Sequence, residues 1–160
     1  MSEERLHAER TIPAPADAVF AVLADPGRHA AIDGTGWVER SLQEEQLREP
    51  GQLFRVRMFH PEHPDGNYDI VNEVLDLDAP HVISWRPGYV GSDGELEFGG
   101  WVWRYDLEQL GPDRTRVVLS YDWSAVGPGP RGYLDFPPFP QDHLPRSLEH
   151  LAGLVADAAG

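Results

Sequence analysis

The stretch ERTIPAPADAVFAVLADPGRHAAIDGTG, residues 9–36, joins the end of a strand to the start of a helix. Weak alternation of apolar and charged residues predicts a strand over residues 5–12. Pro15 is expected at the first position of the helix that follows, because its ring fixes φ near the helical value. Pro26 is expected to end that helix, and a second short helix is predicted over residues 27–32.

A series of strand-like segments with turn residues between them follows, and this pattern is typical of one antiparallel sheet. The segments are residues 37–44, 52–59, 67–77, 81–89, 97–109 and 114–124. A loop rich in proline and glycine then runs from Val126 to Pro140, and such long connections are often functional, for example as lids. Apolar residues beyond it recur at helical spacing, which predicts a C-terminal amphipathic helix of about four turns. They are Leu144, Leu148, Leu151, Val155 and Ala158.

The segment GGWVWRYDL, residues 99–107, places Trp101, Trp103 and Tyr105 at every second position, with charged residues such as Arg104 among those between them. Alternate side chains of a strand leave opposite faces of the sheet, so the three aromatic rings share one face. Each ring can cover roughly 200 Å². Three bare rings would rival the largest apolar patch of a soluble monomer, so either the protein core or a ligand must cover them.

Two turns predict the register of the strands around this stripe, one centred on Pro112 and one on Asp93. The first opposes Trp101 to Trp123, Trp103 to Tyr121, Tyr105 to Leu119 and Leu107 to Val117; the second opposes Trp85 to Trp101 and Ile83 to Trp103. Both place odd-numbered residues on one face, so three neighbouring strands are expected to form one aromatic wall. Trp85, Trp101 and Trp123 are expected to lie in a row across it.

Composition excludes several classes of function. The 160 residues suit one domain, and 27 acidic against 13 basic residues give a formal charge of −14, which repels nucleic acid and anionic membranes. The sequence has no cysteine and no lysine, which excludes disulfides, thiolate nucleophiles and lysine Schiff bases. With no apolar run long enough for a signal peptide or a membrane span, a cytoplasmic location without membrane insertion is expected. The oligomeric state is left open.

Motifs for metal, phosphate and hydrolytic chemistry are not supported. His60 and His63 lie in HPEHPDGN, a turn where three-residue spacing does not bring two imidazoles together, so no metal is expected. The sequence GPGPRG lacks the lysine and the strand-to-helix context of a phosphate loop. No serine lies in a glycine-flanked elbow after a strand, so no hydrolytic triad is expected.

The order of these elements resembles the START-like or SRPBCC superfamily, which includes polyketide cyclases and dehydrases, lipid-transfer domains and plant pathogenesis-related allergens. Residues 9–36 carry the resemblance, supported by FPPFPQDHLPRSLEHLAGLVADAA at residues 136–159. It implies an α+β helix-grip fold over residues 1–160. In that fold a curved seven-stranded antiparallel sheet wraps around a long C-terminal helix, with two short helices between the first two strands. It also implies a cavity between the sheet and the last helix.

The resemblance and the aromatic wall together predict a site for a small hydrophobic, aromatic or polycyclic molecule. Its ligand-binding residues are expected to be Trp85, Trp101, Trp103, Trp123, Ile83, Leu119, Leu144 and Leu148. If the protein is an enzyme of the cyclase or dehydrase type, it needs a base and donors for an enolate oxygen but no cofactor. His143, Tyr105 and Tyr121 are the catalytic candidates. Two alternatives stay open: a non-catalytic carrier or sensor of a lipid or metabolite, and a protein-interaction module with a closed cavity.

Overall fold

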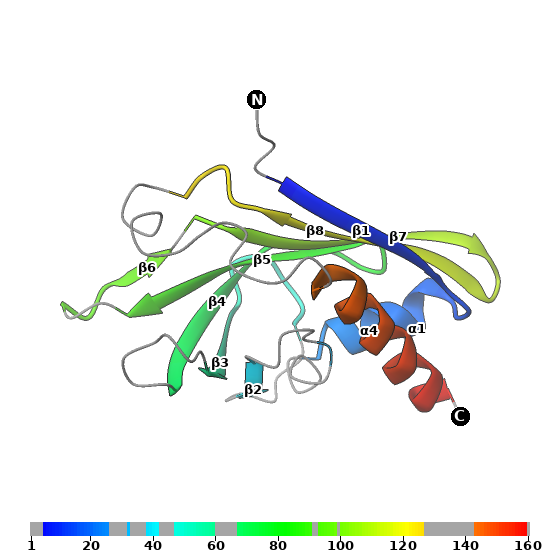
Figure 1. The fold of residues 1–160 in the computed structure, drawn as a ribbon, viewed down its shortest axis with the longest axis horizontal. Helices are drawn as coiled ribbons and strands as arrows, with labels where there is room; N and C mark the ends of the chain where they lie inside the picture. The colour runs from blue at the N-terminus through cyan, green and yellow to red at the C-terminus, as the bar shows by residue number, and fades with distance from the viewer. Residues whose placement is uncertain are drawn as a thin grey trace.

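One antiparallel sheet curves around the helices α1 (Ala16–Leu23) and α4 (His143–Ala159) in a computed structural model of the chain (Figure 1). The structure describes residues 5–25, 32, 38–41, 47–59, 67–90, 93–98, 100–126 and 143–159. The strands are β1 (Arg5–Ile12), β2 (Val38–Ser41), β3 (Leu53–Phe59), β4 (Asn67–Asp78), β5 (Val82–Val90), β6 (Leu96–Phe98), β7 (Val102–Gly111) and β8 (Arg114–Asp122). Seven of these described strands run in the order β1-β8-β7-β5-β4-β3-β2, and the short β6 pairs with β5 beside this path. The expected α+β helix-grip arrangement is confirmed.

Helix α1 begins one residue later than its sequence predicts. Pro15 has an extended ψ of 154°, so it precedes the helix instead of occupying its first position. Its carbonyl accepts hydrogen bonds from the first turn, and the first helical N–H donates to the Gln109 side chain on β7 at 2.8 Å. The helix buries an apolar side that includes Val19 and Phe20. This bond and this burial fix α1 against the sheet.

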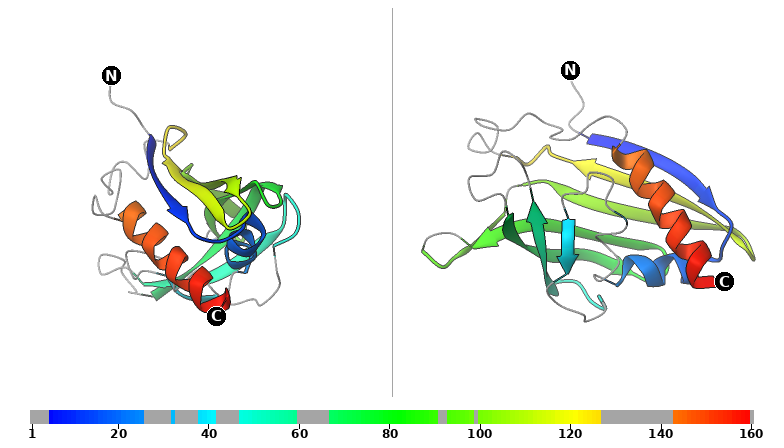
Figure 2. Two further views of the ribbon diagram at one scale, coloured as in Figure 1. Left: turned by 90° about the vertical axis from the view of Figure 1, so that its right-hand side faces the viewer. Right: turned by 60° about the horizontal axis from the view of Figure 1, so that its bottom comes forward.

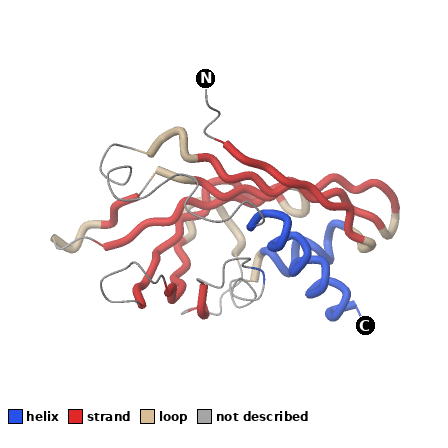
Figure 3. Tube along the Cα trace, viewed as in Figure 1, coloured by secondary structure: helices blue, strands red, loops and turns tan. Residues whose placement is uncertain are grey.

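Helix α4 lies where the sequence predicts it and buries four residues of the expected apolar stripe. Leu144, Leu148, Leu151 and Val155 are each at most 3% exposed. The helix packs against β1, β8 and α1 (Figure 2). Both helices lie over one half of the sheet, and the ends of the central strands extend beyond them (Figure 3).

Two sequence predictions concern segments that lie almost wholly outside the described residues. The second helix predicted over residues 27–32 lies outside the described residues, apart from the buried Ile32. The proline- and glycine-rich loop also lies outside them, apart from its first residue, Val126.

The register across the Pro112 turn is confirmed within the strands. Trp103 opposes Tyr121, Tyr105 opposes Leu119, and the same register continues to Gln109 opposite Thr115, beyond which it shifts by one residue next to the turn. The register predicted across the Asp93 turn is confirmed for the pair of β5 with β6. Gly88 opposes Phe98, and each lies five residues from Asp93, the predicted centre of the turn. Odd-numbered residues of β5, β7 and β8 therefore share the concave face.

The pairing of β5 with β7 corrects the sequence prediction by two residues. Trp85 opposes Trp103 and Ile83 opposes Tyr105, whereas Trp101 was expected opposite Trp85. The predicted strand over residues 97–109 is in fact two strands, β6 and β7, with Gly100 between them.

Gly100 explains this break. Its φ is +102°, and a Cβ atom there would meet the Ala125 carbonyl oxygen at 2.5 Å, so only glycine fits without a shift. Trp101 and Trp123 lie just outside the strands. The row across the three neighbouring strands is consequently Trp85, Trp103 and Tyr121, not Trp85, Trp101 and Trp123.

Candidate functional site

Aromatic side chains gather on the concave face of the sheet, and six of them form what we call the ring cluster. Its members are Phe54, Trp85, Trp103, Tyr105, Tyr121 and Trp123. They come from β3, β5, β7 and β8 and the residue after β8. The cluster spans the central strands because opposed residues of antiparallel strands share a face.

One half of the ring cluster lies beside the start of α4. The centroids of Trp103 and Tyr121 are 4.5 Å apart, and Trp123 lies 5.7 Å beyond Tyr121. His143, the first residue of α4, meets the ring of Trp103 edge to face at 5.4 Å. Trp103 therefore contacts both a phenol and an imidazole that the sequence identifies as catalytic candidates.

The other half of the ring cluster lies farther across the sheet. Tyr105 stacks on Trp85 with a centroid distance of 6.0 Å, and Phe54 meets Trp85 edge on at 5.8 Å. The third catalytic candidate, Tyr105, thus contacts a different ring from the other two. The structure brings Tyr121 and His143 together around one indole and leaves Tyr105 beside another.

Burial divides the expected ligand-binding residues into two groups. The fully buried group consists of Ile83 at 0% exposure, Leu119 and Leu148 at 1%, Leu144 at 3% and Trp123 at 6%. These side chains form the core between the sheet and the helices. The partly buried group consists of Trp85, Trp101 and Trp103, which pack against that core. Only the second group keeps apolar surface that a bound molecule could cover.

Burial also sets the protonation state of Tyr121. The side chain is 2% exposed, and desolvation raises the pKa of its phenol above the ordinary value of a tyrosine. A buried phenol that keeps its proton at neutral pH is a hydrogen-bond donor. At neutral pH it is therefore not suited to remove a proton.

The charged residues of the central strands lie on the opposite, outer face. Arg104 pairs with Asp106 at 3.0 Å and with Asp76 at 3.3 Å, and Arg116 pairs with Glu108 at 3.7 Å. Hydrogen bonding to Asp106 raises the pKa of Arg104, so this guanidinium stays charged. These pairs neutralise one another in part and are exposed to water.

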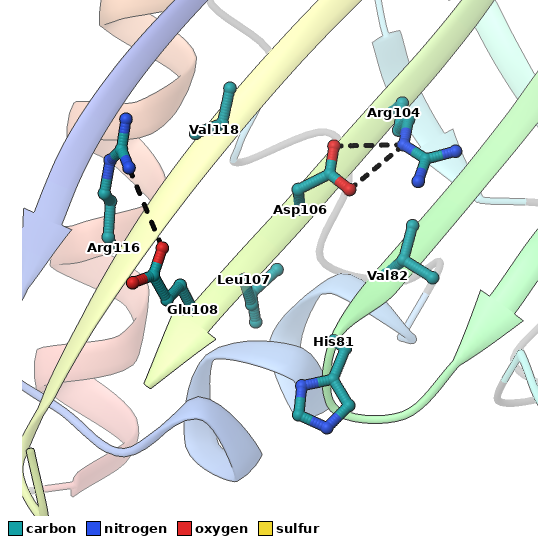
Figure 4. A pocket seen from close by; sticks show the side chains of 8 residues that line it. All are labelled: His81, Val82, Arg104, Asp106, Leu107, Glu108, Arg116 and Val118. Atoms are coloured by element: carbon teal, nitrogen blue, oxygen red, sulfur yellow. Dashed lines mark hydrogen bonds and ion pairs between the residues drawn. The ribbon is translucent and has the colours of Figure 1, made fainter. Parts of the chain in front are cut away.

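A shallow hollow of about 360 Å³ lies among these charges (Figure 4). It is lined by His81, Val82, Arg104, Asp106, Leu107, Glu108, Arg116 and Val118. Its polar lining residues come from the outer face of β7 and β8 and the turn before β5. The hollow is thus separated from the ring cluster by the sheet itself.

Within the described ranges, no three His, Asp or Glu side chains gather where they could hold a metal ion. None of the helices in those ranges combines the length and apolar content needed to cross a bilayer. His60 and His63, the pair considered for metal binding, lie outside the described residues.

Sequence reasoning missed two residues of the concave face, Phe54 and Asn72. Phe54 joins the ring cluster, and Asn72 lies opposite it on β4, only 4% exposed. A signal for Asn72 exists in the sequence, because it stands between Ile70 and Val74 in the alternation of that strand. A polar residue at an otherwise apolar position of a buried face marks a candidate contact.

Comparison with known proteins identifies relatives over most of the chain. A family model described as polyketide cyclase / dehydrase and lipid transport matches residues 3–155. An uncharacterized protein of Mycobacterium tuberculosis, Rv0088, is 30% identical over 116 residues, which cover 72% of this chain and 46% of that protein. The chain spans about half the length of the curated relatives that it matches.

Solved structures share the fold at low sequence identity. Protein NE0264 from Nitrosomonas europaea has a TM-score of 0.71 at 17% identity, covering 99% of this chain and 98% of that one. Norcoclaurine synthase from Thalictrum flavum, in complex with dopamine and hydroxybenzaldehyde, has a TM-score of 0.62 at 16% identity, covering 96% and 86%. At these identities the likeness establishes the architecture alone.

Proposed function

The chain belongs to the polyketide cyclase / dehydrase and lipid transport family, and we propose that it binds a small hydrophobic, aromatic or polycyclic molecule. The proposed site is the concave face of the sheet, where Trp85 and Trp103 lie opposite each other. The two activities in the family description, cyclisation or dehydration and lipid transport, both require a protein that holds a hydrophobic molecule. In norcoclaurine synthase, which shares the fold, the bound molecules are aromatic.

The observation that carries this proposal is the partial burial of Trp85, Trp101 and Trp103 beside a fully buried core. Exposed indole surface costs free energy in water, and flat aromatic ligands are well suited to cover it. A three-ring hydrocarbon that buries roughly 350 Å² gains about 9 kcal/mol at 25 cal/mol per Å². Micromolar binding needs about 8 kcal/mol, so ordering costs leave such a ligand near this threshold and a larger one beyond it.

A titration of tryptophan fluorescence with fluorene tests the proposal. Trp103→Ala should weaken binding about tenfold, because the indole contacts the ligand directly. Arg104→Ala is the matched control, since Arg104 is the next residue of β7 and its ion pairs lie on the outer face. Equal losses in both variants, or no quenching of the wild type by any polycyclic compound, would mean that the rings pack on protein alone. Native mass spectrometry of protein purified without detergent would identify a molecule that is already bound.

A cyclase- or dehydrase-type reaction is the second candidate, favoured by Tyr121 and His143, whose rings lie 4.5 and 5.4 Å from the ring of Trp103. His143 would remove a proton from an acidic C–H group, and the protonated phenol of Tyr121 would donate to the enolate oxygen. Incubation of the retrieved molecule with the protein, followed by mass spectrometry, tests this chemistry. Product formation by wild type that is lost in His143→Gln with unchanged affinity supports it. An unchanged molecule supports the carrier or sensor instead.

A further inference from the structure

Asn72 is a polar residue in the middle of an apolar surface. On β4 it opposes Phe54 of β3 and Pro87 of β5, and all three side chains are buried. Val74, two residues along the same strand, shares its face and opposes Trp85. Asn72 is therefore the diagonal neighbour of Trp85, and such pairs lie roughly 7–8 Å apart.

Most of the buried polar side chains make a hydrogen bond within the protein, and Asn72 differs from them. Ser84 donates to Asp76 at 3.2 Å, Thr115 donates to a backbone carbonyl at 2.8 Å, and Ser120 accepts from an arginine at 3.4 Å. His143 and Ser147 also make contacts, although Nδ1 of His143 is fully enclosed and makes no hydrogen bond. The side chain of Asn72 makes no hydrogen bond to the residues that the structure describes.

Asn72 is 4% exposed, and its amide atoms are not among the fully enclosed side-chain atoms that lack a hydrogen bond, a state found in the described part of the chain for Nδ1 of His143. The amide therefore keeps a little open surface on the concave face, where a polar atom of a bound molecule can reach it. The neighbouring charges do not occupy it, since Glu73 and Arg86 pair with each other at 2.7 Å on the outer face.

We infer that Asn72 is the recognition residue for a neutral aromatic ligand that carries a carbonyl or hydroxyl oxygen, with its amide bonded to that oxygen. This inference rests on the proposed function and adds the chemical class of the ligand. The amide offers two donors and one acceptor, so it matches either kind of oxygen. Neutrality follows from the surroundings, because Phe54, Val74 and Pro87 provide no opposite charge. A molecule that contacts Trp85 can place an oxygen atom beside the Asn72 amide, because the two residues are diagonal neighbours on the sheet.

A matched pair of probes, fluorene and 9-fluorenone, tests the inference by equilibrium dialysis, because the two molecules differ by one carbonyl group. A wholly apolar site prefers the hydrocarbon, since burying a carbonyl without a donor is costly. We expect the wild type to bind 9-fluorenone about tenfold more tightly than fluorene. Asn72→Leu, which is close in volume, should abolish this preference and leave the affinity for fluorene unchanged. Its melting temperature without ligand should be equal to or above that of the wild type.

Ser84→Ala is the control, because it removes a buried polar group from the outer face of β5 and should leave the preference intact. If the wild type binds both probes but prefers fluorene, or if Asn72→Leu keeps the preference for 9-fluorenone, the role of Asn72 is refuted and the proposed function survives. If neither probe binds, both are refuted. The comparison of the two probes on the wild type needs no variant, so a failure of Asn72→Leu to fold does not remove the test.

Discussion

The replacement Gly100→Ala tests the close approach of Gly100 to Ala125. This contact lies between β6 and β7, where the pairing with β5 departs by two residues from the predicted register. Gly100 has a φ of +102°, which L residues rarely adopt, and it approaches the backbone of Ala125 closely. A Cβ atom added there would lie 2.5 Å from the Ala125 carbonyl oxygen and 2.8 Å from the Ala125 carbonyl carbon. Both atoms belong to the backbone, so a side-chain rotation does not relieve the contact.

The two effects in Gly100→Ala add to a substantial loss of stability. A non-glycine residue at positive φ costs about 1–2 kcal/mol, and forcing an atom into a packed site costs about 1–3 kcal/mol. The free energy of unfolding should fall by about 2–5 kcal/mol. For a chain of 160 residues this corresponds to a decrease of roughly 4–20 °C in melting temperature.

Replacements of two other glycines separate the cost of the positive φ from the cost of the close contact, measured by urea and thermal unfolding. Gly51 has a φ of +86° but open space around its Cβ position, so Gly51→Ala should lose only about 1–2 kcal/mol. Gly153 lies within α4 with open space around it, so Gly153→Ala should gain about 0.5–1 kcal/mol. If Gly100→Ala is no less stable than Gly51→Ala, the close approach to Ala125 does not constrain the chain and the reasoning is wrong.

Three further outcomes are expected in equilibrium unfolding. Leu148→Ala removes a core side chain that is 1% exposed and should cost about 2–5 kcal/mol, measured in urea. Thr115→Val removes a buried hydroxyl that donates to a backbone carbonyl at 2.8 Å and should cost about 1–3 kcal/mol, whereas Thr11→Val on the exposed side of β1 should change little. Burial raises the pKa of Tyr121 above its ordinary value of about 10, so the unfolded chain loses this proton first and stability should fall as pH rises above about 10. Tyr121→Phe should remove part of that fall above about pH 10.

The sequence by itself determined the order of the elements, apart from the division of residues 97–109 into β6 and β7, and the face on which the residues of β5, β7 and β8 lie. Alternation is enough for this, because a slip by one residue would move Trp103 and Tyr105 to the charged outer face. The tight turn at Pro112 also fixed the pairing of β7 with β8. The helical spacing of Leu144 and Leu148 was enough to locate α4.

Only the tertiary structure decided which rings oppose one another. A shift of two residues leaves every side chain on the same face, so the pattern that fixes the face carries no information about it. The shift arises where Gly100 passes the backbone of Ala125, a contact between segments that are 25 residues apart in the sequence. It replaces the expected pair of Trp85 with Trp101 by the pair of Trp85 with Trp103.

The tertiary structure also decided which residues of the predicted site remain open to a ligand. The alternation in β5 and β7 places Ile83 and Trp103 on the same face of the sheet. Ile83 is nevertheless fully buried, whereas Trp103 is only partly buried. The difference depends on how far the helices extend across the sheet, which is set by packing between distant segments. Asn72 acquires its significance in the same way, because three separate strands bring Phe54 and Pro87 to its two sides and leave its amide without a hydrogen-bond partner among the described residues.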